Sequence, residues 1–384
     1  MTAAKTIYFD YNATTPLDPQ VREAMLPFLG GVFGNPSSIH HVGRQARAFL
    51  DEARDRVARI WRSKPSEVIF TSGGTESNNL AIFGPARLLR DKGRHLITSQ
   101  IEHHAVLHCF QYLQKKEGFS VTYLPVDHAG LVSPDDLAGA IQPDTILVSI
   151  MAANNEIGTI QPVAALGEIC RSRGIFFHTD AVQWFGKEPF ETIHQFNADL
   201  VSVCSHKFYG PKGAGALFVR SPIHPDPVLF GGGHENERRA GTENMAGIAG
   251  FTEALTRFVR QPVFCPEKLI PLTTRLIKNA RFPDGVEFRG SPQRRLANTA
   301  AFTVAGCDSI TLLAGLDLLG ICASSGSACS AGSLEPSHVL LALGVEKPLA
   351  NSLVRFSLDR TSTLHEVEAV ADAFSHVIKQ ARCR

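Results

Sequence analysis

Short apolar runs alternate with longer, more polar segments along the first two thirds of the chain. The runs expected to form strands cover residues 68–72, 95–100, 121–125, 145–152, 175–181, 200–205 and 214–219. Most stretches between them are long enough for a helix, and residues 44–61 carry apolar side chains at helical spacing. Ser133 is a candidate N-cap, with Pro134 at the first position of a further helix. This alternation predicts an α/β fold with a mainly parallel central sheet and helices on both faces.

The pattern changes after about residue 261. Expected strands at 286–290, 298–306 and 353–359 are interleaved with expected helices at 310–319, 336–343 and 364–379. At 384 residues the chain is too long for one ordinary core. We therefore expect two domains, the second being a smaller α+β domain.

Composition excludes some functions. The hydrophobic fraction of 44% and charged fraction of 20% are typical of globular proteins, and a net charge of +1 argues against nucleic-acid or acidic-membrane partners. No apolar run approaches membrane-spanning length and the start lacks a signal-peptide core, so we expect the cytoplasm. Eight cysteines without a CxxC pair indicate reduced thiols.

A glycine-rich strand–helix junction lies in "VIFTSGGTESNNLAI", residues 68–82. Glycines let backbone N–H groups approach an anion, and a helix N-terminus adds its dipole. Gly73, Gly74 and Thr75 thus predict a phosphate cradle that is neither GxGxxG nor a Walker loop. The alternative is a tight turn in which Thr75 caps the helix.

Two further expected strands deliver reactive groups at their carboxyl ends, where open α/β sheets bind ligands. "GIFFHTDAVQ" brings His178 and Asp180, and "ADLVSVCSHKFYGPKGAGALF" brings Lys207. A carboxylate there could pair with a pyridinium nitrogen and make the ring an electron sink, and a shielded lysine can form a Schiff base. Taken singly, a helix-capping Asp and a surface Lys remain open, but together the three features predict a pyridoxal phosphate site.

The stretch "ICASSGSACSAGSLEPS" contains nothing larger than cysteine between Ser324 and Ser333. Its one reactive side chain is Cys329. Such a density of Gly and Ser predicts an exposed loop that carries a thiol.

Ordered blocks along almost the whole chain identify a family resemblance. They include "YFDYNATTPLDP", "TSGGTESNN", "EHHAVL", "NNEIGTIQP", "HTDAVQ", "SHKFYGPKGAGAL", "GGGHENERRAGTEN", "SSGSACSAGSLEPS" and "VRFSLDRTST". The chain resembles the group I (NifS/IscS-type) cysteine desulfurases of the class V aminotransferase family. The resemblance implies the fold type I of pyridoxal phosphate-dependent transferases. It also implies a large domain at 16–262 and a small domain made of 1–15 and 263–384, which carries the cysteine loop at about 322–335.

The resemblance implies a role for each matching site residue. Lys207 holds the cofactor as a Schiff base, Asp180 faces the pyridine nitrogen, Gln183 faces the ring hydroxyl, and His103 stacks on the ring and assists proton transfer. The residues implied to hold the phosphate are Gly74, Thr75, Cys204 and His206, with Thr242 reaching it from the other subunit of a homodimer. The residues implied to act on substrate are Asn155 and Arg355, which hold its carboxylate, and the nucleophile Cys329.

The implied reaction converts L-cysteine to L-alanine. The sulfur passes to Cys329 as a persulfide and then to a sulfur acceptor or an iron–sulfur scaffold protein. Covalent capture divides one difficult cleavage into two steps.

The chain departs from the family pattern at three places. Cys204 stands where a serine usually binds the phosphate, and a thiol is a weaker donor. Asp359 replaces the usual glycine of "SLGR", which we expect to affect the mouth of the site. The sequence stops at "HVIKQARCR", short of the longer tail of IscS-type members, and together with "GTEN" this leads us to expect a NifS-like member.

Three alternatives remain open. His104 and His108 are spaced i, i+4 and precede Cys109, as in some zinc sites, but no third ligand has a motif spacing. Selenocysteine lyase activity would use the same site. A non-desulfurising cofactor-binding relative would be favoured by loss of Lys207 or Cys329, and both are present.

Overall fold

The larger of the sheets in the computed structural model, which describes residues 6–280, 283–326 and 335–382, has seven strands in the order β2-β8-β7-β6-β5-β3-β4. The strands are β2 (Val68–Thr71), β3 (His95–Ser99), β4 (Ser120–Leu124), β5 (Thr145–Ser149), β6 (Phe176–Asp180), β7 (Leu200–Cys204) and β8 (Gly215–Val219). β8 is antiparallel to both of its neighbours, and the remaining pairs are parallel. All seven expected strands and the mainly parallel sheet are confirmed.

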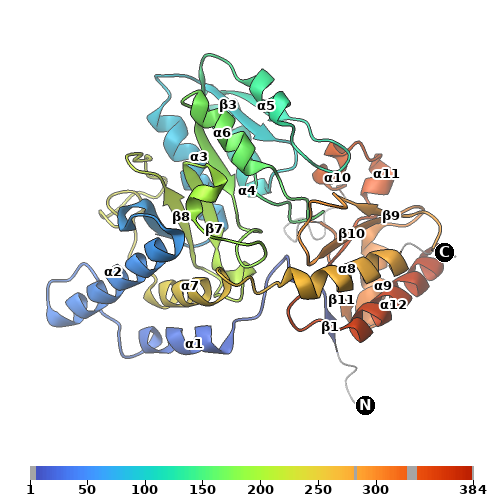
Figure 1. Ribbon diagram of the computed structural model, residues 1–384. Coiled ribbons are helices and arrows are strands. Elements are labelled where there is room, and N and C mark those ends of the chain that lie inside the picture. The colour runs from blue at the N-terminus through green and yellow to red at the C-terminus, as the bar shows by residue number, and fades with distance from the viewer. Residues whose placement is uncertain (1–5, 281–282, 327–334, 383–384) are drawn as a thin grey trace.

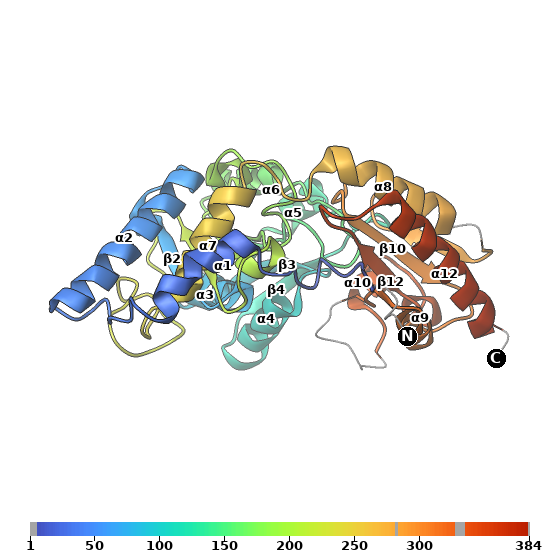
Figure 2. The same cartoon turned by 90° about the horizontal axis from the view of Figure 1, so that it is seen from below.

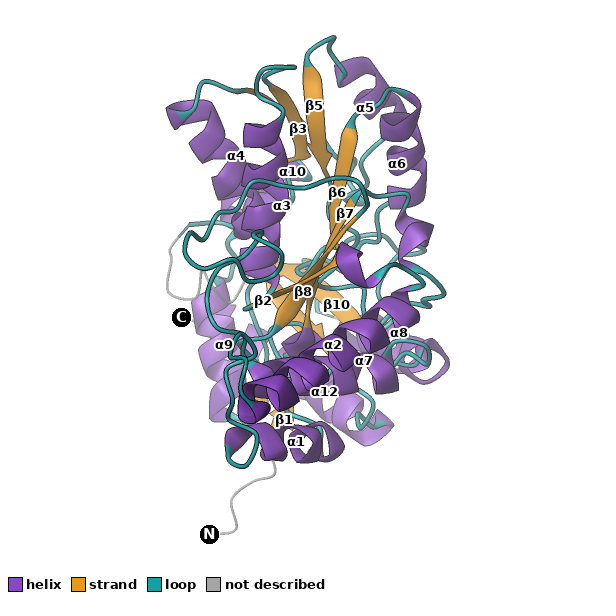
Figure 3. Ribbon diagram, turned by 90° about the vertical axis from the view of Figure 1, so that its left-hand side faces the viewer, coloured by secondary structure: helices purple, strands orange, loops and turns teal. Residues whose placement is uncertain are grey.

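Helices cover both faces of this sheet, as predicted (Figure 3). On one face lie α3 (Gly74–Leu88) and α4 (His104–Lys116), and on the other lie α5 (Pro134–Ala140) and α6 (Val163–Ser172). The hydroxyl of Ser133 accepts hydrogen bonds from the backbone of α5, which confirms the expected N-cap.

The helix expected at 44–61 begins three residues earlier and is α2 (His41–Trp61), capped by His40. It packs with α7 (Met245–Phe258), and α7 also contacts α1 (Pro19–Met25). Short 3₁₀ helices are η1 (Leu26–Leu29), η2 (Pro65–Glu67), η3 (Ile193–Phe196) and η4 (Ser205–Lys207).

A second, antiparallel sheet with the strand order β12-β10-β9 lies in the C-terminal part of the chain (Figures 1 and 2). Its strands are β9 (Val286–Arg289), β10 (Thr299–Val304) and β12 (Val354–Ser357). Its helices are α8 (Pro266–Ala280), α9 (Ser309–Leu318), α10 (His338–Ala342), α11 (Lys347–Ala350) and α12 (Leu364–Arg382). The predicted change of texture after residue 261 therefore marks a change of architecture, while the domain boundaries themselves stay a prediction.

The N-terminal segment connects the two sheet units. β1 (Ile7–Tyr8) pairs in parallel with β11 (Ile321–Cys322), a pairing the sequence did not reveal. A few residues later, the backbone N–H of Asn12 donates to Ser357 Oγ at 2.9 Å, and the N–H of Thr15 donates to the carbonyl of His206 at 3.0 Å. The segment therefore joins β12 to the turn that follows β7.

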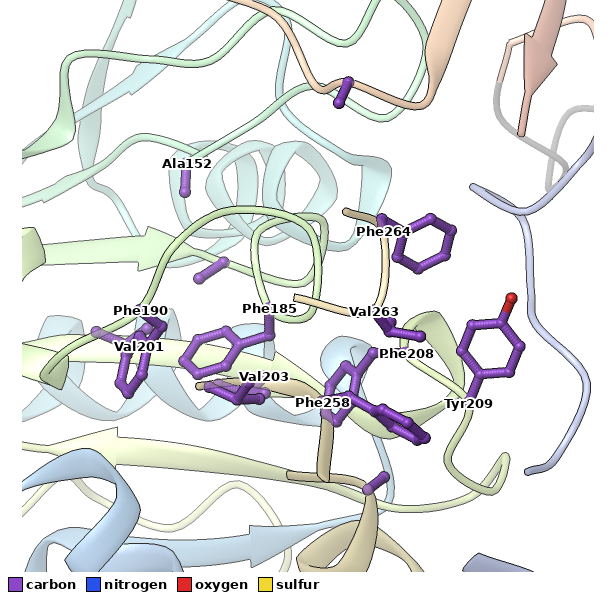
Figure 4. Close-up of a cluster of buried hydrophobic side chains, with 14 of the residues drawn as sticks. Ala152, Phe185, Phe190, Val201, Val203, Phe208, Tyr209, Phe258, Val263 and Phe264 are labelled. Atoms are coloured by element: carbon purple, nitrogen blue, oxygen red, sulfur yellow. The ribbon is translucent and has the colours of Figure 1, made fainter. Parts of the chain in front are cut away.

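Aromatic side chains fill the core of the larger unit close to that turn (Figure 4). Phe185, Phe208 and Phe264 are fully buried, and the rings of Phe185 and Phe190 lie 4.9 Å apart. Burial of large aromatic side chains on this scale fixes the backbone that carries them. Within the described ranges, every helix is too short or too polar to span a bilayer.

Candidate active site

A cavity of about 220 Å³ opens at the carboxyl edge of the parallel strands. The expected residues that line it are Gly74, Thr75, His103, Asn155, Asp180, Gln183, Cys204, His206, Lys207 and Arg355. They come from the ends of β6 and β7, the start of α3, the start of α4, the connection between β5 and α6, and the strand β12. The structure thus brings together most of the site residues that the sequence indicated.

Lys207 ends the short helix η4 directly after β7. Its Nζ donates to the main-chain oxygens of Asn12 at 2.8 Å and Ala13 at 2.7 Å. Burial lowers the pKa of Lys207 to about 8, because a charged amine is costly to desolvate. The amine is therefore close to the uncharged form that attacks carbonyl carbons.

Asp180 is the last residue of β6 and is buried. One carboxylate oxygen accepts from Asn78 Nδ2 at 2.7 Å and the other from the N–H of Val182 at 3.0 Å. The sequence reasoning missed Asn78, which lies one turn into α3, although it stands inside the quoted "TSGGTESNN" block. Its amide holds the carboxylate of Asp180 in one orientation.

Glycines shape the anion cradle at the start of α3. Gly73 has φ of +147°, and a Cβ on Gly74 would lie 2.7 Å from Val182 Cγ2. Only glycine allows the helix N-terminus to approach the end of β6 this closely. The backbone N–H groups at that terminus carry the partial positive charge that favours a phosphate.

Cys204 and His206 lie beside the cradle. Burial raises the pKa of the Cys204 thiol, so it is present as the neutral SH group. Burial also lowers the pKa of His206 to about 4, and its Nδ1 lies 3.2 Å from Thr14 Oγ1. At neutral pH both side chains can offer hydrogen bonds without adding charge.

His103 is the N-cap of α4. Its Nδ1 accepts from the N–H of Ala105 at 3.1 Å, which leaves the proton of the neutral ring on Nε2. Burial lowers the pKa of His103 and favours this neutral form. The imidazole therefore lines the cavity as an uncharged ring.

Arg355, on β12, is 1% exposed. Its Nη2 forms an ion pair with Asp10 Oδ1 at 2.5 Å, and its Nη1 donates to the carbonyls of Asn155 at 2.8 Å and Gly326 at 3.0 Å. Its Nε finds no partner among the described residues. A guanidinium held in this way retains a donor for a carboxylate.

Gln183 and Asn12 form a further pair at the base of the cavity. Gln183 Nε2 donates to the main-chain oxygen of Asn12 at 2.9 Å, and Lys187 Nζ donates to Gln183 Oε1. Asn12 and Lys187 were not singled out from the sequence, although "YNATTP" was part of the resemblance.

One expected site residue does not line this cavity. Thr242 is exposed and lies in a separate depression with Arg239 and Asn244. The expected nucleophile, Cys329, lies outside the described residues.

Two further features of the sequence now have a place. Asp359 is buried away from the cavity, where its Oδ2 accepts from the hydroxyl of Tyr209 at 2.5 Å. Asp359 does not line the cavity, so the structure shows no contact through which it would affect the mouth of the site. His104 and His108 stack on α4 with ring centroids 5.0 Å apart, but no third metal ligand joins them in the part of the chain that the structure describes.

A buried lysine, a strand-end carboxylate and a glycine-led helix N-terminus around one cavity define an enzyme of the pyridoxal phosphate-dependent class. The model of the aminotransferase class V family matches residues 7–370, and the chain belongs to this family.

Several individual proteins of known name or structure are similar to nearly the whole chain. A cysteine desulfurase IscS of Dictyoglomus turgidum is 47% identical over 380 residues, covering 98% of this chain and 96% of that protein. A solved NifS-like protein superposes with a TM-score of 0.90 at 35% identity and covers 98% of this chain and 100% of its own. A structure of SspA in complex with cysteine has a TM-score of 0.82 at 36% identity, with coverage of 93% and 100%.

Proposed function

We propose that the protein is a cysteine desulfurase that converts L-cysteine to L-alanine and passes the sulfur to an acceptor. The main support for this proposal is that Lys207, a buried amine with a pKa of about 8, lines the same cavity as Asp180 and Arg355. Curated relatives named cysteine desulfurase match nearly the whole chain, and a solved relative is described in complex with cysteine.

The residues around the cavity fit pyridoxal 5′-phosphate. Lys207 would bind its carbonyl carbon, Asp180 would face the ring nitrogen, and Gln183 would face the ring oxygen. The groups for the phosphate are those of the cradle, Gly74, Thr75, Cys204 and His206. When bound, the cofactor supplies an electron sink for the negative charge that develops on the substrate.

The chain's own residues bind the substrate and move its proton. Arg355 and Asn155 would hold the substrate carboxylate at the β12 side of the cavity, where the guanidinium is already fixed by Asp10. His103 lines the same cavity, and burial favours its neutral form. A neutral imidazole beside the substrate can take up a proton and return it.

Cys329 would take the sulfur. Its thiolate attacks the substrate sulfur, an S–S bond forms, and the C–S bond breaks. The electron pair of that bond stays with the substrate carbon, which takes up a proton to give L-alanine. Cys329 then carries a persulfide, and an acceptor thiol or a sulfur-scaffold protein removes the outer sulfur.

A homodimer would complete the site. Exposed apolar side chains gather on the α1–α2 connection and the loop after β8, namely Leu29, Phe33, Ile39 and Phe230. Exposed apolar surface of this kind marks protein contacts. We place a second copy of the chain here, with Thr242 of one subunit reaching the phosphate cradle of the other, in the cytoplasm.

Subunit mixing tests the shared site. We expect Thr242→Ala to weaken cofactor binding about tenfold through loss of one hydrogen bond to a charged group. Mixing Lys207→Ala subunits with Thr242→Ala subunits rebuilds one intact site per hybrid dimer, so cofactor binding recovers in part. In a hybrid dimer of wild type with a chain that carries both changes, neither site is intact. No recovery in the first mixture, with full binding kept at every wild-type chain in the second, would place Thr242 in its own subunit's site.

Alanine release tests the proposed reaction. Purified protein with bound cofactor, L-cysteine and a reductant should form L-alanine, and Cys329→Ala should lose that activity while keeping its bound cofactor. If Cys329→Ala formed alanine as fast as wild type, the role of Cys329 would be wrong. Turnover of selenocysteine measured in parallel separates a desulfurase from a selenocysteine lyase.

A further inference from the structure

Lys187 is a buried amine beside the cavity that the proposed reaction does not use. It is 1% exposed, its Nζ lies 5.2 Å from the ring centroid of Phe264, and it has no ion-pair partner among the described residues. Burying a lysine in this way is costly unless its nitrogen is fully hydrogen-bonded. Its contacts therefore indicate what it does.

The turn that holds Lys187 is packed tightly against the segment that holds Lys207. Gly186 has φ of +76°, and a Cβ there would lie 2.6 Å from Cβ of Phe208, the residue after Lys207. Only glycine permits this approach. The two lysines are thus fixed relative to each other by backbone packing.

Lys187 Nζ meets two side-chain amides through their oxygens. It donates to Asn12 Oδ1 at 2.6 Å and to Gln183 Oε1. Asn298 Nδ2 also donates to Asn12 Oδ1, at 3.0 Å. Because a lysine donates hydrogen bonds here, both amides must turn their oxygens toward it and their NH₂ groups away.

This orientation decides what Gln183 presents to the cavity. One N–H of its amide goes to the main-chain oxygen of Asn12, and since Gln183 lines the cavity, the second N–H is available to a ligand. Without Lys187, the amide could turn over and present its oxygen instead. An oxygen facing the anionic ring oxygen of the cofactor would be repulsive.

Asn12 extends the same constraint to the rest of the site. Its Nδ2 donates to the main-chain oxygen of Asn155 at 3.2 Å and to Thr299 Oγ1 at 2.9 Å. Its main-chain oxygen accepts from Lys207. Asn12 therefore links Lys187, which contacts its side chain, to Lys207, which contacts its main-chain oxygen, and to Asn155, a proposed substrate residue.

The surroundings of Lys187 disfavour a positive charge on its amine. Lys207 and Arg355 oppose a charge on Lys187, whereas Glu188 favours it. Burial, the largest effect, takes the pKa of Lys187 well below its ordinary value. Whether charged or not, the amine has enough N–H groups to donate to both amide oxygens that it faces.

We propose that Lys187 is a positioning residue that locks the amide of Gln183 with its N–H toward the ring oxygen of the cofactor. The identity of that ligand rests on the proposed function, while the orientation of the amide rests on its contacts with Lys187 and with the main-chain oxygen of Asn12.

A pH titration of the cofactor's visible absorption tests this proposal in the holoenzyme without L-cysteine. An N–H donated to the ring oxygen draws negative charge from it and weakens its hold on the cofactor's own proton. Loss of that donor should raise the midpoint of the titration by about one pH unit, the size expected of one such hydrogen bond. Lys187→Met and Gln183→Leu should both show this rise, and the double variant should show no further rise. Lys379→Met, at an exposed position on α12, is the matched control and should titrate like wild type.

The proposal is overturned if Lys187→Met titrates like wild type while Gln183→Leu shifts, or if the two shifts add in the double variant. Should Lys187→Met fail to fold with cofactor, Lys187→Gln keeps an N–H donor and takes its place. A midpoint nearer to wild type then supports the proposal, and a midpoint equal to that of Gln183→Leu overturns it. Because no L-cysteine is present, failure of the desulfurase proposal would leave this result unchanged.

Discussion

At the scale of single residues, burial gives the site its charge pattern. It moves the amine of Lys207 and the imidazoles of His103 and His206 toward their uncharged forms. Arg355 contributes a guanidinium, whose planar donors suit a carboxylate. It lies on the β12 side of the cavity, where the substrate carboxylate is proposed to bind.

The lowered pKa of Lys207 leads to a prediction about cofactor loading. Only the unprotonated amine attacks the cofactor, so the rate at which cofactor-free protein gains its yellow colour should rise with pH and level off above about 8. Stopped-flow absorbance at a series of pH values measures this rate. Lys207→Ala should gain no such colour. A rate that climbs without levelling until about pH 10.4, the ordinary lysine value, would show that burial does not tune this amine.

Sequence reasoning located Lys207 and Asp180 because each follows an apolar run that is recognisable as a buried strand. It did not find Asn12, Asn78 or Lys187. Each of these acts through a partner distant along the chain, as in the bond between Lys187 and Asn12. A lone asparagine or lysine carries no local pattern that predicts such a contact.

At the scale of elements, the site depends on how closely α3 approaches the end of β6. The strands β6 and β7 pair in parallel and so deliver Asp180 and the η4 turn to one edge of the sheet. Gly74 lets the N-terminus of α3 lie against Val182 at that edge. A single added methyl group tests this approach.

Gly74→Ala should weaken cofactor binding and lower the free energy of unfolding. The new Cβ would lie 2.7 Å from Val182 Cγ2, and overpacking of this kind costs about 1–3 kcal/mol. Cofactor titration and denaturant unfolding measure the two effects. Gly139→Ala is the matched control, because a Cβ there meets nothing within 4 Å on α5, and it should leave stability equal or slightly higher. Equal behaviour of the two variants would contradict the account of the cradle.

The strands of the larger sheet were predictable because each is a short apolar run bounded by polar residues. The pairing of β1 with β11 was not, since each strand has two residues and the partners lie more than 300 residues apart. The antiparallel direction of β8 was also missed, although the connection between β7 and β8 is shorter than a parallel crossover usually requires.

At the scale of the whole molecule, the two sheet units are joined by buried polar contacts that pass close to the site. Asn12 bonds to β12 and to Lys207. Tyr209, just after Lys207, donates to Asp359 just after β12, and the guanidinium of Arg360 lies 4.2 Å from the centre of the Tyr209 ring. Asp359, a departure from the family pattern, therefore joins the smaller unit to the segment that carries Lys207.

Tyr209→Phe should destabilise the protein by about 1–3 kcal/mol, because it leaves one oxygen of the buried Asp359 without its donor. The same change in an Asp359→Asn background should cost less, since the charge that the hydroxyl compensates is gone. Denaturant unfolding of the four proteins gives the coupling between the two residues. Equal costs in both backgrounds would show that the contact does not hold the units together.

The central claim is that the sulfur of L-cysteine passes to Cys329, and mass spectrometry of the protein tests it most directly. After the holoenzyme is mixed with L-cysteine and no reductant, the peptide that contains Cys329 should gain the mass of one sulfur atom, and the gain should vanish when a reductant is added. The result that would contradict the account is L-alanine formed in an equivalent amount while that peptide keeps its original mass.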